Sequence, residues 1–185
     1  IIHFWQAGIN ILSGSENIIK NCKVLENYEG IWIESSSSGN IIHKCRIYQN
    51  EADGIMIAGS SSNEISWNEI YDNGGVYPGF GILIENGADS NLIEGNDIYW
   101  SGDDSHIQEA GIILTGSGTS ATVITQNVIH DHCHTGVMME NGANPLIKRN
   151  RIHDNGNRGI YVWESSPKII NNLIYGYQND GIYIY

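Results

Sequence analysis

The sequence predicts an all-β fold, a single-stranded parallel β-helix (solenoid) of about seven to eight coils. The first observation is a repeat in which a glycine is followed by apolar, variable and apolar residues. It recurs at Gly8, Gly30, Gly54, Gly81, Gly111, Gly136, Gly159 and Gly181. The second observation is that each repeat alternates over β-branched residues with a period of two, which is typical of strands and not of helices.

Two further columns complete each repeat. One column stands two residues before another Ile or Val, at Cys22, Cys45, Asn68, Asn96, Asn127, Asn150 and Asn172. The other lies three residues beyond that Ile or Val, at Asn27, Asn50, Asn73, Ser101, His132, Asn155 and Tyr177. A unit of ~22 residues with three short strands cannot bury its own apolar face, so it becomes stable only when copies stack in register. Stacking turns both columns into ladders, in which buried Asn side chains pass hydrogen bonds from coil to coil.

Composition limits the function classes. The chain has 185 residues with 21 acidic and 9 basic side chains, a formal net charge of −12, and one domain over residues 1–185 is expected. The charge argues against nucleic acid as a partner and against adsorption on an anionic membrane. No apolar run approaches the ~20 residues of a membrane-spanning helix, so no membrane insertion is expected.

The ends of the sequence suggest a part of a longer protein. The first residue is Ile rather than Met, and residues 181–185 end inside a predicted strand. An open strand edge is normally protected in isolated proteins. We therefore expect a fragment or processed part of a longer chain, whose end coils stack on the rest of the parent chain or on another subunit.

The connection before the repeated glycine is enlarged in two consecutive coils, over residues 74–80 and 102–110. Because both insertions occupy the same corner of adjacent coils, we expect them to form one wall. The next coil carries the titratable run of residues 130–134 at that corner. The predicted patch contains Asp103, Asp104, His106, Glu109, Asp131, His132, His134 and Arg158.

Paired acids and histidines serve as general acid and base when their environments separate their pKa values. The candidate catalytic residues are Asp104, Glu109, Asp131, Glu140 and His132. Glu109 or Asp104 would be the acid, with Asp131 or Glu140 as its partner. Two alternatives stay open: His132 is a ladder variant that bonds across coils, and the Asp103-Asp104 pair is ordinary turn chemistry.

No metal site is predicted with a full signature. Three His side chains at 130, 132 and 134 would need an extended corner to bind zinc. Calcium is the candidate cofactor, since Asp103, Asp104 and Glu109 offer hard oxygen ligands.

A second candidate surface is the outward side of the glycine-containing strands, which is unusually apolar and aromatic for a face exposed to water. Aromatic rings pack against the C–H faces of sugars while Glu accepts hydroxyl hydrogen bonds. The candidate substrate-binding residues of this face and of the wall are Trp32, Glu85, His106, His134, Arg158, Tyr161 and Trp163. The alternative is that another segment or a neighbouring subunit covers the face.

The Asn-x-Ile and Gly-Ile-x-Ile spacing resembles the parallel β-helix repeats of the pectate-lyase-like superfamily, and more narrowly its carbohydrate-binding and sugar-hydrolase repeat class. The resemblance covers almost the whole chain and implies right-handed winding. Asp103 and Asp104 are similar to the Asp-Asp pair of polygalacturonases, which share the fold, but that family's Asn-Thr-Asp, Gly-His-Gly and Arg-Ile-Lys motifs are missing. Because related repeats also occur in non-catalytic proteins, the resemblance specifies a scaffold rather than an activity.

Three functions are compatible with these residues. The first is a carbohydrate-active β-helix that binds an extended polysaccharide or oligosaccharide and hydrolyses it with paired carboxylates. The second is a non-catalytic structural or interaction module in an adhesin, surface filament or assembly factor. The third is a polysaccharide lyase, which would need cations or calcium beside the uronate. The resemblance implies an extracellular or periplasmic location, because most polysaccharides lie outside the cytoplasm.

Overall fold

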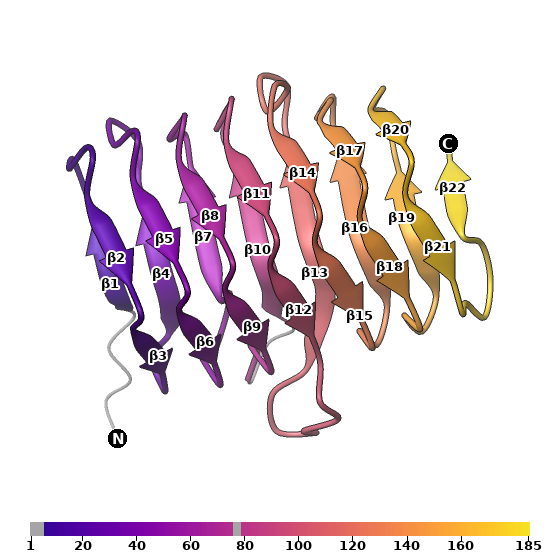
Figure 1. Cartoon of the computed structure of the whole chain (residues 1–185), viewed down its shortest axis with the longest axis horizontal. Coiled ribbons are helices and arrows are strands. Elements are labelled where there is room, and N and C mark those ends of the chain that lie inside the picture. The colour runs from indigo at the N-terminus through magenta and orange to yellow at the C-terminus, as the bar shows by residue number, and fades with distance from the viewer. Residues whose placement is uncertain (1–5, 76–78) are drawn as a thin grey trace.

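The computed structural model describes residues 6–75 and 79–185, which form 22 strands in three parallel sheets (Figure 1). Sheet A contains β1 (Ala7–Ile11), β4 (Glu29–Ile33), β7 (Ile55–Ala58), β10 (Gly79–Glu85), β13 (Gln108–Thr115), β16 (Thr135–Glu140), β19 (Arg158–Val162) and β22 (Ile182–Ile184). Sheet B contains β2 (Ile18–Lys20), β5 (Ile41–His43), β8 (Glu64–Ser66), β11 (Leu92–Glu94), β14 (Val123–Thr125), β17 (Leu146–Lys148) and β20 (Lys168–Ile170). Sheet C contains β3 (Lys23–Leu25), β6 (Arg46–Tyr48), β9 (Glu69–Tyr71), β12 (Asp97–Tyr99), β15 (Val128–His130), β18 (Arg151–His153) and β21 (Leu173–Tyr175).

Each strand pairs with the strand three places further along the chain, as β1 does with β4. Each coil therefore contributes one strand to each sheet, and the coils follow one another along the long axis (Figure 1). This is the predicted parallel solenoid, and the alternation of the repeats explains its core. In sheet A the partners Ile82 and Ile112 are fully buried, whereas Leu83, the next residue on β10, points outward. Among residues 6–75 and 79–185 there is no helix of the length and apolarity that crossing a bilayer requires.

The repeated glycine is required by the close approach of successive coils. A Cβ atom on Gly81 would lie 2.6 Å from the carbonyl oxygen of Gly111 and 2.6 Å from a methyl group of Ile98. Neither the main chain of the next coil nor a buried Ile can move away cheaply. Glycine therefore marks the corner at which the chain enters sheet A.

The Asn column between sheets B and C forms a continuous hydrogen-bonded ladder. The Nδ2 of Asn68 donates to Asn96 Oδ1 at 2.9 Å, and the Nδ2 of Asn96 donates to Asn127 Oδ1 at 3.0 Å. Each Nδ2 also donates to a main-chain carbonyl of the preceding coil, as from Asn96 to Ile65 at 2.8 Å. The interior is thereby polar at its corners without leaving these amides unpaired.

In the column between sheets C and A, the structure corrects one predicted position. Ser101 does not occupy the ladder, because the insertion in its coil precedes the ladder place. Gln108 fills it instead, and its Oε1 accepts Asn73 Nδ2 at 3.1 Å. Ser101 is displaced outward, where its hydroxyl donates to the Asp72 carboxylate at 2.6 Å.

The two insertions meet, as predicted for adjacent coils. The main-chain nitrogen of Gly79 donates to the carbonyl of Ile107 at 3.3 Å. Residues 76–78 of the first insertion lie outside the described residues. The second insertion protrudes as a long loop before β13 (Figure 1).

Candidate functional site

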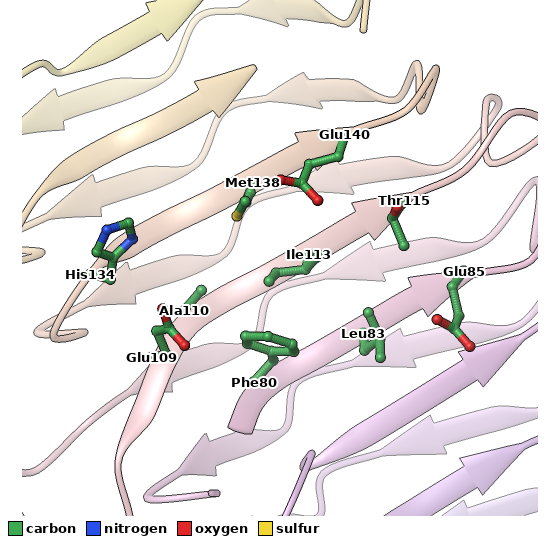
Figure 2. Close-up of a pocket in the computed structure, with 10 residues that line it drawn as sticks. All are labelled: Phe80, Leu83, Glu85, Glu109, Ala110, Ile113, Thr115, His134, Met138 and Glu140. Carbon is green, nitrogen blue, oxygen red and sulfur yellow. The ribbon is translucent and has the colours of Figure 1, made fainter. Parts of the chain in front are cut away.

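The outward face of sheet A carries a groove over β10, β13 and β16 (Figure 2). Side chains that alternate with the buried core line it, and the loop residue His134 joins them. The lining residues are Phe80, Leu83, Glu85, Glu109, Ala110, Ile113, Thr115, His134, Met138 and Glu140. Four of the residues predicted from the sequence, Glu85, Glu109, His134 and Glu140, thus share one surface depression.

The groove has an apolar floor and polar ends. Leu83, Ile113 and Met138 are register partners on successive coils and form the middle of the floor. Figure 2 shows Glu109 and His134 at one end of the strands, and Glu85 and Glu140 at the other. An extended chain can therefore lie over apolar surface while its polar groups reach carboxylates beside it.

Glu109 and Glu140 do not form a carboxylate pair. Glu140 is the register partner of Thr115, so it stands six residues further along the strand direction than Glu109, on the neighbouring coil. At ~3.3 Å per residue and ~4.8 Å between coils, their Cα atoms are about 20 Å apart. Glycosidases hold their two carboxyl groups within ~10 Å. Hydrolysis by this pair, expected from the sequence, is therefore not supported by the geometry.

His134 is held in one orientation at the groove's end. Its Nε2 lies 2.9 Å from Asn157 Nδ2, and its Nδ1 lies 3.0 Å from Thr135 Oγ1. Because an amide nitrogen only donates, Nε2 is the acceptor and Nδ1 carries the proton. The two contacts hold the imidazole as a positioned hydrogen-bonding group at the end of the groove.

Aromatic residues continue the outward columns beyond the groove. Tyr161 follows Met138 in the register of sheet A, and Trp163 donates its main-chain N–H to Met139. The Arg158 guanidinium lies 5.1 Å from the Tyr161 ring centroid and 4.5 Å from that of Tyr183. The guanidinium is also 3.7 Å from the Asp180 carboxylate, so the Arg158 side chain is engaged at this aromatic end, while its main-chain nitrogen donates to the His134 carbonyl at 3.2 Å.

Trp32 lies at the other end of the same outward column. It is the register partner of Asn10 and of Met56. Met56 in turn aligns with Leu83 of the groove, so Trp32 lies two coils before the groove. Its half-buried indole extends the apolar floor toward the first coils.

In the protruding loop, the Asp103 carboxylate forms hydrogen bonds within the loop itself. Asp103 accepts hydrogen bonds from the hydroxyl and main-chain nitrogen of Ser105, and its carboxylate lies 3.3 Å from His106 Nδ1. The Ser105 hydroxyl is the main cause that lowers the pKa of Asp103 to about 2. Asp104 is exposed on the same loop. Asp103 therefore stabilises the turn of its own loop, as the alternative interpretation of the Asp103-Asp104 pair expected. Neither Asp104 nor His106 lines the groove.

His132 is inside the solenoid, where no substrate on the outer surface can reach it. Its side chain is 1% exposed, and its main-chain nitrogen donates to Asn155 Oδ1 at 3.1 Å. Burial lowers the pKa of His132 to about 3, so the ring is neutral at physiological pH. His132 therefore occupies the ladder place, but neither of its ring nitrogens has a hydrogen-bond partner among the described residues, and the predicted catalytic role is not supported.

Asp131 directly follows β15 of sheet C. Its carboxylate lies 2.7 Å from His130 Nδ1, and His130 Nε2 lies 3.1 Å from Asp97. The Asp97 hydrogen bond is the main cause that raises the pKa of His130. Asp131 lines a separate hollow beside Trp100 and not the groove that contains Glu109, so the predicted pairing of Asp131 with Glu109 is not formed.

The outward face of sheet C carries a continuous stack of aromatic and imidazole rings. Tyr48, Tyr71, Tyr99, His130, His153 and Tyr175 stack with centroids 4.9 to 5.1 Å apart. Because each inner ring covers the faces of its neighbours, only ring edges are offered outward. This agrees with a stacking role for His130 and His153.

The sequence reasoning missed two buried acids at the start of sheet A. Glu29 and Asp53 stand one residue before the repeated glycine on adjacent coils, and are 9% and 7% exposed. Glu29 Oε2 accepts the Asp53 main-chain N–H at 2.9 Å, and Asp53 Oδ1 accepts that of Phe80 at 2.9 Å. Desolvation raises the pKa of Glu29 to about 7 and that of Asp53 to about 8. Their position before the glycine was visible in the sequence, but their burial was not.

The calcium candidate does not assemble in the described part of the chain. Glu109 lines the groove, whereas Asp103 bonds within the loop. No group of three or more His, Cys, Asp or Glu side chains in residues 6–75 and 79–185 is arranged to hold a metal ion.

Comparisons with known proteins agree on the architecture. The family model for the right handed beta helix region matches residues 1–118 and 81–185. Comparison with the curated proteins finds no match. Among solved structures, the periplasmic alginate epimerase AlgG is 17% identical with a TM-score of 0.75, over 91% of this chain. The alginate lyase from Paenibacillus sp. str. FPU-7 is 16% identical with a TM-score of 0.60, over 96% of this chain and 72% of the lyase.

At these identities the two likenesses show the fold alone. The chain spans 42% of the length of the alginate epimerase, so the activity of that whole protein does not transfer with the fold.

Proposed function

The chain belongs to the right-handed β-helix family, and on this premise we propose that it binds an extended polysaccharide along the outward face of sheet A. The groove over β10, β13 and β16 is the observation that carries the proposal. Its apolar floor suits the C–H faces of sugar rings, and Glu85, Glu109 and Glu140 suit their hydroxyl and other polar groups. The named polysaccharide-acting enzymes with the same fold support this class of ligand.

The neighbouring aromatic end extends the proposed surface. Tyr161 and Trp163 continue the outward columns of Met138 and Glu140, so a chain along the axis passes from the groove onto their rings. The proposed location is extracellular or periplasmic, where such polymers occur, and the periplasmic alginate epimerase with this fold supports it.

Removing these two rings should weaken binding. We expect Tyr161→Ala with Trp163→Ala to lower the affinity for bound oligosaccharide by about tenfold, because aromatic contacts contribute ~0.5–1.5 kcal/mol each beyond burial. Calorimetric titration measures the change. Tyr48→Ala on sheet C is the matched control and should leave binding unaltered. Equal losses in both variants, or binding by neither wild type nor control, would contradict the proposed face.

Polysaccharide cleavage by β-elimination is the second candidate, favoured by the alginate lyase among the solved structures with this fold. Incubation with alginate should then produce an unsaturated sugar end, visible as a rise in ultraviolet absorbance, and His134→Ala should abolish it. A binding module without cleavage gives no rise with any uronate polymer. This readout separates the enzyme from the non-catalytic alternative.

A further inference from the structure

A row of carboxylates follows the outward face of sheet A at every second coil. The outward position after each apolar pair is occupied in turn by Glu34, Ala58, Glu85, Thr115, Glu140 and Trp163. The register of sheet A aligns Ala58 with Glu85 and Thr115 with Glu140. Two coils separate successive acids, so their Cα atoms lie about 9.6 Å apart. We call Glu34, Glu85 and Glu140 the carboxylate row.

These carboxylates lack cationic partners. Glu34 accepts a hydrogen bond from Asn10 Nδ2, and Glu85 accepts one from Asn86 Nδ2. Glu140 makes no side-chain hydrogen bond or ion pair with another described residue. All three side chains are half-buried beside apolar neighbours. There the effective dielectric constant is lower than in water, so the Coulomb attraction between a carboxylate and a cationic ligand is stronger.

The surroundings add no positive charge. Residues 47–147 contain 14 Asp and Glu and no Lys or Arg. Arg158 is the one Lys or Arg in the described strands of sheet A, and it is engaged by Tyr161, Tyr183 and Asp180. A groove lined by one sign of charge concentrates ligands of the opposite sign and repels those of its own sign. A polymer of uronates would bring a negative charge on every sugar to this surface.

We propose that the groove selects a polysaccharide with free amino groups, whose ammonium groups pair with the carboxylate row. This rests on the proposed binding of an extended chain to sheet A. In an extended β-1,4-linked chain, one sugar unit is about as long as the ~4.8 Å spacing of neighbouring coils. Alternate sugars present the same side and therefore repeat at about the spacing of the acids. Amino groups on alternate sugars would then meet Glu34, Glu85 and Glu140, while Ala58 and Thr115 leave room for the sugars between.

The apolar column beside the row completes the fit. Met56, Leu83, Ile113 and Met138 are consecutive register partners, so they form a continuous strip parallel to the acids. The ring faces of the chain lie on the strip, and the charged nitrogen donates toward the carboxylate, an arrangement that strengthens each hydrogen bond.

Ligands that share one backbone test the charge requirement. Oligosaccharides of β-1,4-linked glucosamine, their fully N-acetylated forms and oligouronates from alginate are titrated separately near pH 6, where carboxylates and ammonium groups are charged. We expect the amino form to bind at least tenfold more tightly than the acetylated form, and the uronate form to bind most weakly. Equal affinity of amino and acetylated chains, or tighter binding of uronates, overturns the amino-sugar inference but leaves polysaccharide binding intact. No binding by any of the three overturns both.

Because the whole chain has a net negative charge, nonspecific attraction of the cationic oligosaccharide must be distinguished from its binding to the carboxylate row. Glu85→Gln and Glu140→Gln keep the size of the side chain, and each should weaken amino-oligosaccharide binding about fivefold and binding of the acetylated chain by a smaller factor. Glu94→Gln on β11 of sheet B makes the same change of charge on another face and should have no effect. Equal weakening by all three variants would show general attraction only, and the inference would fail.

Discussion

Replacing Asn127 with alanine is expected to lower the free energy of unfolding by about 3–6 kcal/mol. Asn127 Oδ1 accepts Asn96 N at 2.9 Å and Asn96 Nδ2 at 3.0 Å, and its Nδ2 donates to Ile93 O at 2.9 Å and to Asn150 Oδ1 at 3.0 Å. Alanine leaves several buried groups unpaired, each costing ~1–3 kcal/mol. Denaturant unfolding followed by circular dichroism measures the loss.

Asn172 provides the comparison for this experiment. It occupies the same ladder one coil beyond Asn150 but is only half-buried, so water can replace the amide after substitution. Asn172→Ala should cost less than half as much as Asn127→Ala. A loss below about 1 kcal/mol for Asn127→Ala would mean that the buried ladder does not stabilise the solenoid.

Stability should fall as the pH rises from about 6.5 to about 8.5, because two buried acids resist ionisation. Desolvation raises the pKa of Asp53 to about 8 and that of Glu29 to about 7, and each carboxyl's charge opposes the other. A raised folded-state pKa gives stability that is complete below the ordinary pKa near 4 and is lost as the pH passes the folded value. We expect a loss of roughly 2 kcal/mol across this window, or about 4–8 °C in Tm.

Asp53→Asn should remove most of this pH dependence and raise the melting temperature at the alkaline end. Its amide oxygen can still accept the Phe80 N–H that Asp53 Oδ1 accepts now. The exposed Asp104→Asn is the control for the loss of one charge. The neutral His132 acts oppositely: its lowered pKa makes stability fall as the pH drops below ~6.5, outside the chosen window. An unchanged pH slope in Asp53→Asn would contradict the assignment.

The repeat determined most of the architecture because each column is a local pattern. The repeated glycine, the alternating Ile and the Asn two residues before Ile together predict three short strands in each coil, and these form the three sheets. The same spacing also marks a third set, Asn17, Asn40, Asn63 and Asn91, which precedes the buried Ile of sheet B and was overlooked. There Asn40 Nδ2 donates to Asn63 Oδ1 at 3.0 Å, and Asn63 Nδ2 donates to Asn91 Oδ1 at 3.0 Å.

The candidate site was harder to predict because insertions shift positions around the corner. Counting from Ile98 placed Ser101 in the ladder, but the loop precedes Gln108, which takes that place. The grouping of His132 with Asp131 failed for a related reason. Adjacent residues at a corner point into the core and out over sheet C, so nearness in sequence did not bring them together. Glu85 and Glu140 were identified because strand alternation fixes which way they point.

The direction of the main-chain hydrogen bonds has a mechanical consequence. In all three sheets they run from coil to coil along the long axis, and β1 and β22 stand at opposite ends of sheet A (Figure 1). Tension applied between these ends should therefore peel the molecule one turn after another, each release lengthening the tether by a similar step. A force spectrum would be a sawtooth of small, evenly spaced events rather than a single rupture.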